Sequence, residues 1–503
     1  MIKSKNNKHL FISILFYLIC WFIAAKYFIH GINPDSISYI SISKKYYNGN
    51  FFEAINAYWG PLFSWLLLPS FLLKIEQHIF ARLITIFLSI ILFVLINKFL
   101  IRLNVNEKIR VLGIYFFILP AIYFSFYRLT PDYLLLIITL IYVYLTTEEK
   151  FWDSKSLVFL SSFLGALMFL TKSYGLMFFL SYQTILIFIE YLLYKKISKI
   201  VLVRYIVSII LFLILIAPWI YLLSEKYGSF TISSSGTINL RIVNPELNFK
   251  HPSIDSGFAI PSDKFSVSAW DDPNINSYPN WNPFSNIQDL KYFVFNTLKN
   301  VLKFLLFFIV FSPPLALFAF LIKVKDLKNI ILLKILIAAI IFALGYTPIY
   351  IENRYIWPTF ILLSLIGFYS LSSAQIKIFT SKTYSVLINL IIIISFSPFM
   401  IYGLKQQAPN NDFYFQAKNI KDRFELFGNF ASTNHWEQGL AFSYFLNSKF
   451  FGTEKLSINN PKLYEKAKKL GINYIFDYTE EPYQLSNLKF IGKIDSIRIF
   501  KVE

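Results

Sequence analysis

The stretch Gly31–Pro69 reads GINPDSISYISISKKYYNGNFFEAINAYWGPLFSWLLLP, and the rest of the chain is organised around it. It follows an apolar run at residues 10–29 and is neither a membrane span nor a short loop. An acidic residue, Asp35, stands just after a proline, and many Tyr, Trp and Ser residues follow. A carboxylate placed where a membrane helix leaves the bilayer is a functional-site hypothesis by default. We therefore expect Asp35 to mark a functional site.

The composition excludes a soluble globular protein. Hydrophobic residues make up 56% of the 503 residues, charged residues make up 15%, and the mean hydropathy is +0.53. Apolar runs long enough to cross a bilayer recur along the chain, which predicts a polytopic α-helical membrane protein. The first run lacks a small-residue cleavage site, so we interpret it as a retained helix. The single cysteine, Cys20, excludes an intrachain disulfide and a cysteine-based metal site.

The net charge of +19 comes largely from basic clusters in alternate short loops. These clusters lie at residues 3–8, 98–110, 195–204, 323–328 and 377–382. Basic residues in alternate loops are typical of the cytoplasmic side of a membrane protein. The basic residues therefore indicate which loops lie on the cytoplasmic side. A nucleic-acid partner is not expected.

With the N-terminus in the cytoplasm, the apolar runs predict about eleven transmembrane helices. We place them at residues 10–29, 79–101, 109–126, 131–147, 156–171, 174–194, 201–223, 297–322, 329–346, 355–373 and 384–403. Every basic cluster then falls inside, and the long polar segments 30–78, 224–296 and 404–503 fall outside. We expect a multi-pass protein of the inner (cytoplasmic) membrane.

The three outer segments have different patterns. Residues 35–48 predict an interfacial helix with Ile37, Ile40, Ile42 and Tyr46 on its apolar side, and residues 58–73 predict a second interfacial piece. Residues 224–296 interleave Trp and Pro and predict a folded loop; a mobile linker is the alternative. Residues 404–503 alternate helix and strand patterns, which predicts a small extracytoplasmic α/β domain beside a transmembrane domain at 1–403.

Few polar residues stand near the predicted outer helix ends, and most of them are charged. They are Asp35, Arg82, Arg128, Asp132, Lys172, Glu352, Arg354 and Tyr355. The predicted topology puts them all on one face of the membrane. Two carboxylates with several cations suit an anionic, membrane-borne substrate, because Arg and Lys match phosphate oxygens. A carboxylate can also take a proton from an acceptor as general base. We assign Glu352 no role.

Each of these residues also has a structural interpretation. Asp35 could cap the helix that begins there, and Asp132 could complement a helix dipole. Arg128 and Lys172 could extend to lipid headgroups, the commoner role of a lone basic residue at a helix end. Two histidines, at 30 and 78, lack a partner at a metal-ligand spacing, so we interpret them as polar interfacial residues.

The order of these features resembles the GT-C class of integral-membrane glycosyltransferases. The features are, in order, the acid at the head of the first outer loop, Tyr58-Trp59-Gly60-Pro61-Leu62, Ala81-Arg82-Leu83, Pro131-Asp132, Lys172–Gly175, and Arg354-Tyr355 followed by Pro358. Within that class the chain is similar to bacterial relatives of the dolichyl-phosphate-mannose protein mannosyltransferases and of the lipid A aminoarabinose transferases. The resemblance covers nearly the whole chain. It rests on the order and sidedness of the motifs, since none is specific alone.

The resemblance implies a catalytic role for Asp35 as the base of an inverting transfer from a polyprenyl-phosphate sugar to a glycan, lipid or protein acceptor. Many members carry two adjacent acids where this chain has Asp35-Ser36, which leaves Asp132 as the nearby substitute. The residues expected to bind the donor phosphate are Arg82, Arg128, Lys172, Arg354 and Tyr355. Those expected to line an acceptor or sugar pocket are Tyr39, Tyr58, Trp59 and Trp270. No cofactor is expected; a divalent metal is allowed but not required, because hard cations need several oxygen ligands.

Other functions share the lipid-linked substrate. A transporter or flippase of lipid-linked saccharides is the first alternative, and such proteins often show internal repeats and charges at the bilayer midplane. Here the sequence shows no repeat, and the charges stand at one predicted surface. A polysaccharide polymerase or ligase, and a pseudo-enzyme whose outer domain binds a partner, are further alternatives.

Overall fold

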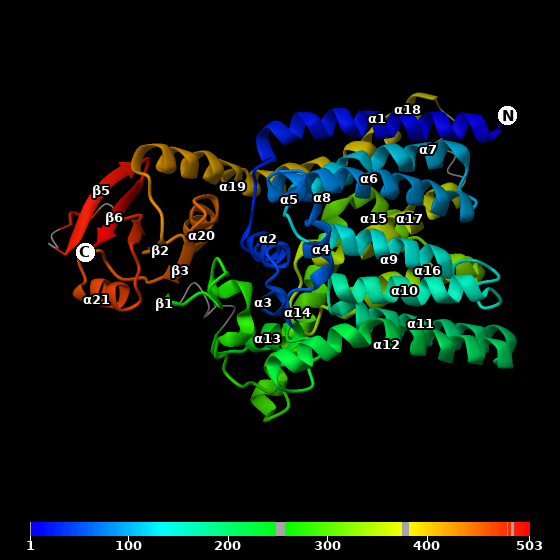
Figure 1. Ribbon diagram of the computed structural model, residues 1–503. Helices are drawn as coiled ribbons and strands as arrows, with labels where there is room; N and C mark the ends of the chain where they lie inside the picture. Colours follow the sequence, from blue (N-terminus) through cyan, green and yellow to red (C-terminus); the bar gives the residue numbers. More distant parts are fainter. Residues whose placement is uncertain (1, 248–256, 375–381, 480, 484–486) are drawn as a thin grey trace.

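The computed structural model describes residues 2–247, 257–374, 382–479, 481–483 and 487–503. It is a bundle of long helices with a mixed β-sheet beyond one end (Figure 1). Part of the predicted loop 224–296, at 248–256, and part of the basic cluster 377–382 lie outside the described residues. The bundle and the sheet are described in turn.

The bundle consists of long helices from both halves of the chain. The first half gives α1 (Ile2–Phe28), α6 (Gln77–Arg102), α7 (Glu107–Phe116), α8 (Ile118–Phe126), α9 (Asp132–Thr146), α10 (Lys155–Thr171), α11 (Tyr174–Tyr194) and α12 (Lys199–Tyr227). The second half gives α14 (Ile287–Phe311), α15 (Pro313–Phe320), α16 (Ile330–Leu344), α17 (Trp357–Ser373), α18 (Lys382–Ile394) and α19 (Ser397–Phe424).

Eight helical segments within the described residues are long and apolar enough to cross a membrane. They overlap eight of the predicted spans, with α7 and α8 together forming one of them. The other three predicted spans coincide with α9, α10 and α16, which are apolar but only 15 to 17 residues long. These helices therefore fit a multi-pass membrane protein, and the count of eleven stays a prediction.

Short elements cover the end of the bundle that carries the sheet (Figure 1). They are α2 (Pro34–Tyr47), α3 (Phe51–Ala54), α4 (Pro61–Leu66), α5 (Pro69–Leu72), α13 (Ser235–Ile242) and the single 3-10 turns η1 (Ala269–Asp271), η2 (Pro273–Ile275) and η4 (Asn353–Ile356). A further 3-10 turn, η3 (Val324–Lys328), connects α15 to α16. All three predicted outer segments thus contribute to the same end of the molecule.

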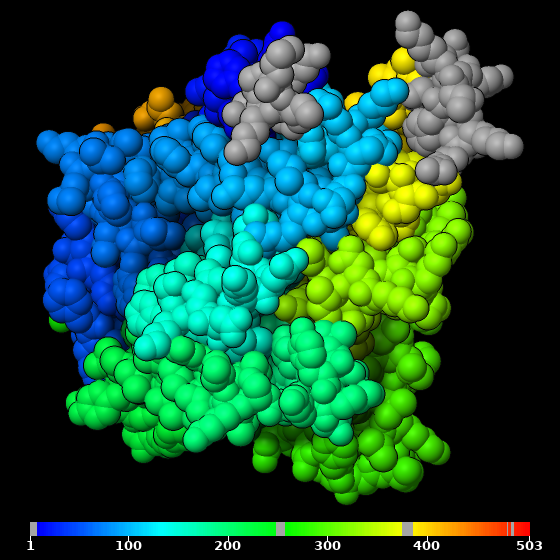
Figure 2. All heavy atoms as spheres, turned by 90° about the vertical axis from the view of Figure 1, so that its right-hand side faces the viewer, coloured from blue at the N-terminus to red at the C-terminus, as the bar shows by residue number. Residues whose placement is uncertain are grey.

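The opposite end of the bundle faces the viewer in Figure 2, where the red C-terminal strands are not seen. The connections α6–α7 and α11–α12, which carry two of the basic clusters, lie at this end (Figure 1). The basic connections and the sheet are therefore at opposite ends, as the alternation of charge predicts.

The helix α2 forms where the sequence predicts it, but its surroundings differ from the prediction. An interfacial helix leaves its polar side in water, yet here the serine side is buried as completely as the isoleucine side. The serine side packs on η1, where the Asp271 carboxylate accepts hydrogen bonds from Ser38 Oγ at 3.1 Å and Ser41 Oγ at 2.5 Å. The pattern of α2 did not reveal this second buried side because serine is also common on wet surfaces.

The loop between α12 and α14 is shorter than predicted and belongs to two parts of the fold. It ends at residue 286, because the Asn286 side chain caps α14 by accepting from the amides of Gln288 and Asp289 at 2.9 Å. One piece, β1 (Gly257–Phe258), pairs antiparallel with β3 (Lys449–Thr453) at the edge of the sheet. Another piece, η1, covers α2. The described part of the loop is therefore folded.

The sheet has the order β1-β3-β2-β4-β6-β5. Its other strands are β2 (Asn429–Ser432), β4 (Tyr474–Asp477), β5 (Leu488–Ile494) and β6 (Ile497–Val502). The β2 strand runs parallel to both β3 and β4, and the helices α20 (Trp436–Phe445) and α21 (Pro461–Lys469) make the two crossovers. Strands and helices alternate after residue 429, as the patterns of residues 404–503 predict.

The bundle joins the sheet through α19, which continues without a break to Phe424 across the predicted boundary at 403/404. Apolar residues after α1 and in α2, Ile32 and Ile37, pack against Leu440 and Phe450 of the sheet layer. The backbone amide of Phe450 also donates to the Val267 carbonyl at 2.7 Å. These contacts fix the sheet over the end of the bundle where Asp35 lies.

Candidate functional site

The corner between α1 and α2 places Asp35. Asn33 is the N-cap of α2; its amide donates to Ser36 Oγ at 2.9 Å, and that hydroxyl donates back to the Asn33 carbonyl at 2.6 Å. The Asn33 side chain accepts from the Leu129 amide at 3.1 Å, which fixes the corner to the turn before α9. Because Asn33 and Ser36 make the hydrogen bonds of this corner, the Asp35 carboxylate is left to contact side chains from other parts of the chain.

Arg354, in η4, is the centre of the site. Its Nη2 lies 2.8 Å from Asp35 Oδ2, its Nε lies 2.6 Å from Glu352 Oε2, and its Nη1 lies 3.7 Å from Asp132 Oδ2. The Arg354 side chain is only 6% exposed. A planar guanidinium can serve several carboxylates at once because its donors point in fixed, diverging directions. One buried arginine therefore links acids from three distant parts of the chain.

Lys172, between α10 and α11, supplies a second cation. Its Nζ lies 2.6 Å from Asp132 Oδ1, and Thr130 Oγ1 donates to Asp132 Oδ2 at 2.6 Å. The lysine also stands 4.4 Å from the ring centre of Tyr355, a cation–π contact. Gly60 brings the first outer loop against this turn, because a Cβ there would lie 2.4 Å from the Thr171 carbonyl oxygen. The first outer loop can therefore approach the Lys172 turn this closely only because residue 60 is glycine.

Glu352 was given no role in the sequence analysis, and the structure places it in the same cluster. Besides its contact with Arg354, it lies 3.4 Å from Nη1 of Arg128. The resulting Arg354 cluster contains three acids and three cations: Asp35, Asp132, Glu352, Arg128, Lys172 and Arg354. The charges balance in number, so the cluster tolerates low exposure. Sequence reasoning missed Glu352 because its neighbour Arg354 offered a local partner and gave no sign of a second one.

The charges around Asp35 set its ionisation. Burial acts to raise the pKa of Asp35, but Arg354, Arg128 and Lys172 outweigh it and hold that pKa below the usual value. Asp35 is therefore a carboxylate at neutral pH. Its second oxygen, Oδ1, lies 3.4 Å from the indole Nε1 of Trp270. Arg354 is the cation in direct contact with it.

The four residues predicted to line a pocket lie together beside Asp35. The rings of Tyr39 and Trp59 are 5.1 Å apart, and Trp270 lies 5.3 Å from Trp59 and 5.2 Å from Tyr58. Tyr39, Trp59 and Trp270 are nearly fully buried and form an aromatic wall. Their expected role in an acceptor or sugar pocket stays a prediction. The Tyr58 hydroxyl donates to Asn239 of α13 at 3.0 Å.

Arg82 lies apart from the Arg354 cluster. Its two Nη groups donate to the carbonyls of Gly31 and Ser125, both at 2.6 Å, and the side chain is buried. These contacts tie the end of α1 to α8. The geometry of Arg82 therefore fits a residue that positions the α1–α2 corner, and its expected contact with a donor phosphate stays a prediction.

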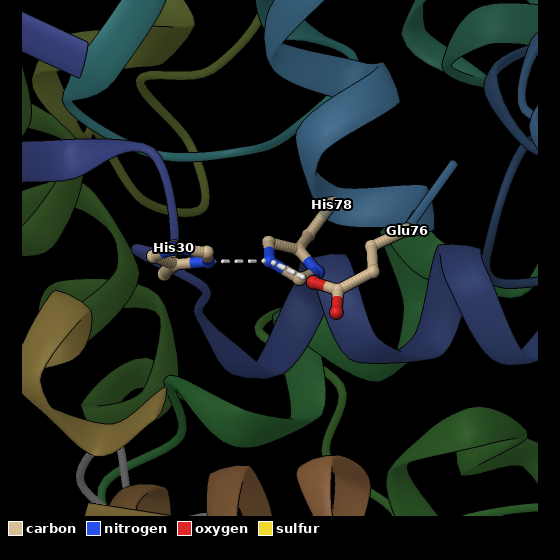
Figure 3. A group of neighbouring side chains, drawn as sticks. All are labelled: His30, Glu76 and His78. Carbon is tan, nitrogen blue, oxygen red and sulfur yellow. Dashed lines mark hydrogen bonds and ion pairs between the residues drawn. The ribbon is translucent and has the colours of Figure 1, made fainter. Parts of the chain in front are cut away.

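The two histidines that lack a partner at a metal-ligand spacing in the sequence, His30 and His78, are in contact in the structure. His30 Nδ1 lies 3.1 Å from His78 Nε2, and Glu76 Oε2 lies 3.3 Å from the same atom (Figure 3). The spacing of 48 residues gave no signal. The start of α6 folds back beside the end of α1 and brings them together.

Asp271 is a buried carboxylate that sequence reasoning missed. It is fully buried and accepts from Ser38, Ser41 and the Val267 amide. Burial, only partly offset by Lys45 and these hydrogen bonds, raises the pKa of Asp271 to about 6. It stands in the sequence Trp270-Asp271-Asp272-Pro273, whose two acids are the only signal for it.

No family model and no curated protein matches the sequence. Solved structures match its fold. ArnT from Cupriavidus metallidurans, solved bound to undecaprenyl phosphate, aligns with a TM-score of 0.58 over 97% of this chain and 97% of its own, at 11% identity. The Archaeoglobus fulgidus oligosaccharyltransferase in the apo form aligns with a TM-score of 0.51 over 94% of this chain and 69% of its own, at 11% identity. The chain therefore has the fold of the GT-C glycosyltransferases.

Proposed function

We propose that this chain transfers a sugar from a polyprenyl-phosphate donor to an acceptor on the outer face of the cytoplasmic membrane, with Asp35 as the base. The observation that carries the proposal is the ion pair of Asp35 and Arg354, at 2.8 Å, inside the six-charge Arg354 cluster. The fold adds support, because a protein of the same fold, ArnT, was solved with undecaprenyl phosphate.

The balanced charges suggest how the donor engages the site. Binding a phosphate beside Arg354 adds negative charge to a cluster whose acids and cations are equal in number. Arg354 can then exchange its contact with Asp35 for a phosphate oxygen, and Lys172 can meet the same group as a point charge. Phosphate binding would thereby release the Asp35 carboxylate close to the reacting carbon. The apolar polyprenyl tail would enter from the bilayer between the helices.

The transfer itself is a single displacement. The acceptor oxygen or nitrogen attacks the sugar C1 while the bond between C1 and the phosphate oxygen breaks. The proton of the acceptor passes to Asp35, and the electron pair of the broken bond stays on the polyprenyl phosphate. Arg354 and Lys172 stabilise the charge that develops on this leaving group because they are held in place beforehand. The configuration at C1 is inverted.

A reconstitution experiment separates this proposal from a flippase. Purified protein in liposomes is given a panel of polyprenyl-phosphate hexoses and pentoses together with a membrane extract as acceptor source. We expect release of free polyprenyl phosphate, measured by mass spectrometry, that depends on the extract and inverts the anomeric configuration. Intact donor appearing on the opposite leaflet without release of the carrier would contradict the proposal and favour a flippase.

Binding of the carrier can be tested without an acceptor. Undecaprenyl phosphate should raise the Tm of the detergent-solubilised protein, whereas undecaprenol, which has the same tail and no phosphate, should not. The difference isolates recognition of the phosphate from recognition of the tail. Equal shifts with both lipids would mean that the cation cluster does not bind the phosphate.

A further inference from the structure

A second constellation of side chains lies at the same end of the bundle but shares no residue with the Arg354 cluster. His30 follows the last turn of α1, while Glu76 and His78 begin α6. Figure 3 shows the two imidazoles and the carboxylate pointing toward one another. One ligand atom from each lies within 4.8 Å of the others.

A single hydrogen atom on His78 Nε2 cannot form good hydrogen bonds to both His30 and Glu76. Nε2 of His78 lies 3.1 Å from a nitrogen of His30 and 3.3 Å from a carboxylate oxygen of Glu76. If that nitrogen is protonated, its one hydrogen can serve only one neighbour; if it is unprotonated, its lone pair faces the carboxylate lone pairs. A cation placed among the three atoms would be attracted to all of them.

The separations also suit a transition metal. Bonds of about 2.0–2.1 Å from zinc to histidine nitrogen, and about 2.0–2.2 Å to carboxylate oxygen, place neighbouring ligand atoms of a tetrahedron roughly 3.3 Å apart. The two observed separations are 3.1 Å and 3.3 Å. Two imidazoles and one carboxylate form a ligand set that zinc uses in proteins. Hard cations such as Mg²⁺ prefer oxygen ligands and are disfavoured here.

The ligand side chains are oriented by their neighbours. The His30 ring stacks on Tyr414 with centroids 3.8 Å apart and planes 2° apart, and the Tyr414 hydroxyl also forms a hydrogen bond with Glu76. The ring of Phe445 meets His78 edge-on at 5.5 Å. Such outer contacts are typical of metal sites, because they fix ring orientation.

We propose that His30, Glu76 and His78 form a binding site for one divalent transition-metal ion, with Zn²⁺ as the best-fitting ion. Three protein ligands leave a fourth position open. Glu76 and His78 also line a cavity of about 500 Å³ between α2, the loop 264–267 and the sheet layer. A water or an anion from this cavity can complete the tetrahedron. The ion would tie the end of α1 to the start of α6.

Cobalt provides a direct test, because tetrahedral Co²⁺ absorbs visible light strongly and octahedral Co²⁺ only weakly. The full chain is purified through a tag without histidine, treated with a chelator and titrated with Co²⁺ and then Zn²⁺. We expect one tetrahedral Co²⁺ per chain, displaced by one equivalent of Zn²⁺. An octahedral spectrum, or no binding at Co²⁺ concentrations in excess of the protein, would overturn the proposal.

Substitutions locate the site. Glu76→Gln is the safest variant for folding because the Glu76 side chain is 51% exposed. It should weaken Zn²⁺ binding at least tenfold, and His30→Ala should remove the tetrahedral Co²⁺ spectrum. The matched control is His435→Ala, an exposed histidine of the sheet layer, which should change neither property. Equal metal binding by wild-type, Glu76→Gln and His30→Ala proteins would place the ion elsewhere and overturn the assignment.

Discussion

Two aspartates at the same helix have pKa values shifted in opposite directions. Asp35, in the first turn of α2, faces Arg354, and the surrounding cations hold its pKa below the usual value. Asp271 lies against the serine side of α2 and meets two hydroxyls and one backbone amide, and burial raises its pKa to about 6. At Asp271, Lys45 and the hydrogen bonds offset the effect of burial only in part, whereas at Asp35 the cations Arg354, Arg128 and Lys172 outweigh it.

The two aspartates therefore suit different roles. A carboxylate that is charged at neutral pH and can exchange its arginine partner is suited to accepting a proton. A carboxylate that is sealed under a helix and protonates near pH 6 is suited to holding the loop 266–272 over α2. The difference lies in the partners of each carboxylate, since both residues are aspartates at α2, one in its first turn and one against its serine side.

The largest effect is expected from Arg354→Gln, which removes the cation that three carboxylates share. Breaking a buried ion pair from one side costs about 3–5 kcal/mol because charges are left without a partner. We expect unfolding in urea to report a loss of this size, together with loss of the Tm increase caused by undecaprenyl phosphate. Arg498→Gln is the control: it breaks the buried pair with Asp477 in the sheet and should destabilise the protein without abolishing the lipid effect. If undecaprenyl phosphate raises the Tm of both variants equally, Arg354 does not bind the phosphate.

A smaller effect of opposite sign is expected from Asp271→Asn. A folded-state pKa of about 6, in place of 3.8, means that the native state keeps the proton over this range while the unfolded chain loses it. Wild-type stability therefore falls as the pH rises from about 4 to 6, by up to about 3 kcal/mol. The asparagine side chain carries no charge, so the variant should gain that amount at pH 8 relative to wild type and little at pH 4. The denaturant midpoints of the variant and the wild type at pH 4 and pH 8 measure this difference in stability. A less stable variant at pH 8 would contradict the prediction, because it would show that the charged Asp271 side chain stabilises the fold.

The smallest effect is expected from Lys172→Met. Asp132 keeps its contacts with Thr130 and Arg354, so the fold should survive, but one cation is lost from the phosphate site. The affinity for undecaprenyl phosphate should fall roughly tenfold, the size of one charge-assisted hydrogen bond. Lys226→Met is matched to it, because Lys226 pairs with Asp272 at the same end of the bundle and outside the cluster. If both variants bind the lipid equally well, Lys172 is structural.

The sequence predicted the parts of the molecule that depend on local patterns. Apolar runs and basic loops located the helices and their alternation, and the predicted topology put all six members of the Arg354 cluster on one face. The alternation of helices and strands after residue 404 followed from the helix and strand patterns of that segment. Each of these features is encoded within a few residues of itself.

The sequence did not predict features that depend on contacts between distant segments. Glu352 gains Arg128 as a second partner from 224 residues away, and Asp271 meets Ser38 from 233 residues away. His30 and His78 meet only because α1 and α6 end and begin side by side. The sequence does not show whether a hydroxyl or a histidine will bond to water or to a buried side chain. Only the folded structure distinguishes these two cases.

The central claim, that the carboxylate of Asp35 takes the proton of the acceptor, is tested most directly by turnover in Asp35→Asn. Asparagine keeps the shape and the contact with Trp270 but cannot act as a base at neutral pH. With a donor that the wild-type protein uses, we predict that release of polyprenyl phosphate falls by about a thousandfold, the usual contribution of a general base. The variant should still bind undecaprenyl phosphate. Turnover within a few-fold of wild type, in a folded Asp35→Asn protein, would contradict the claim.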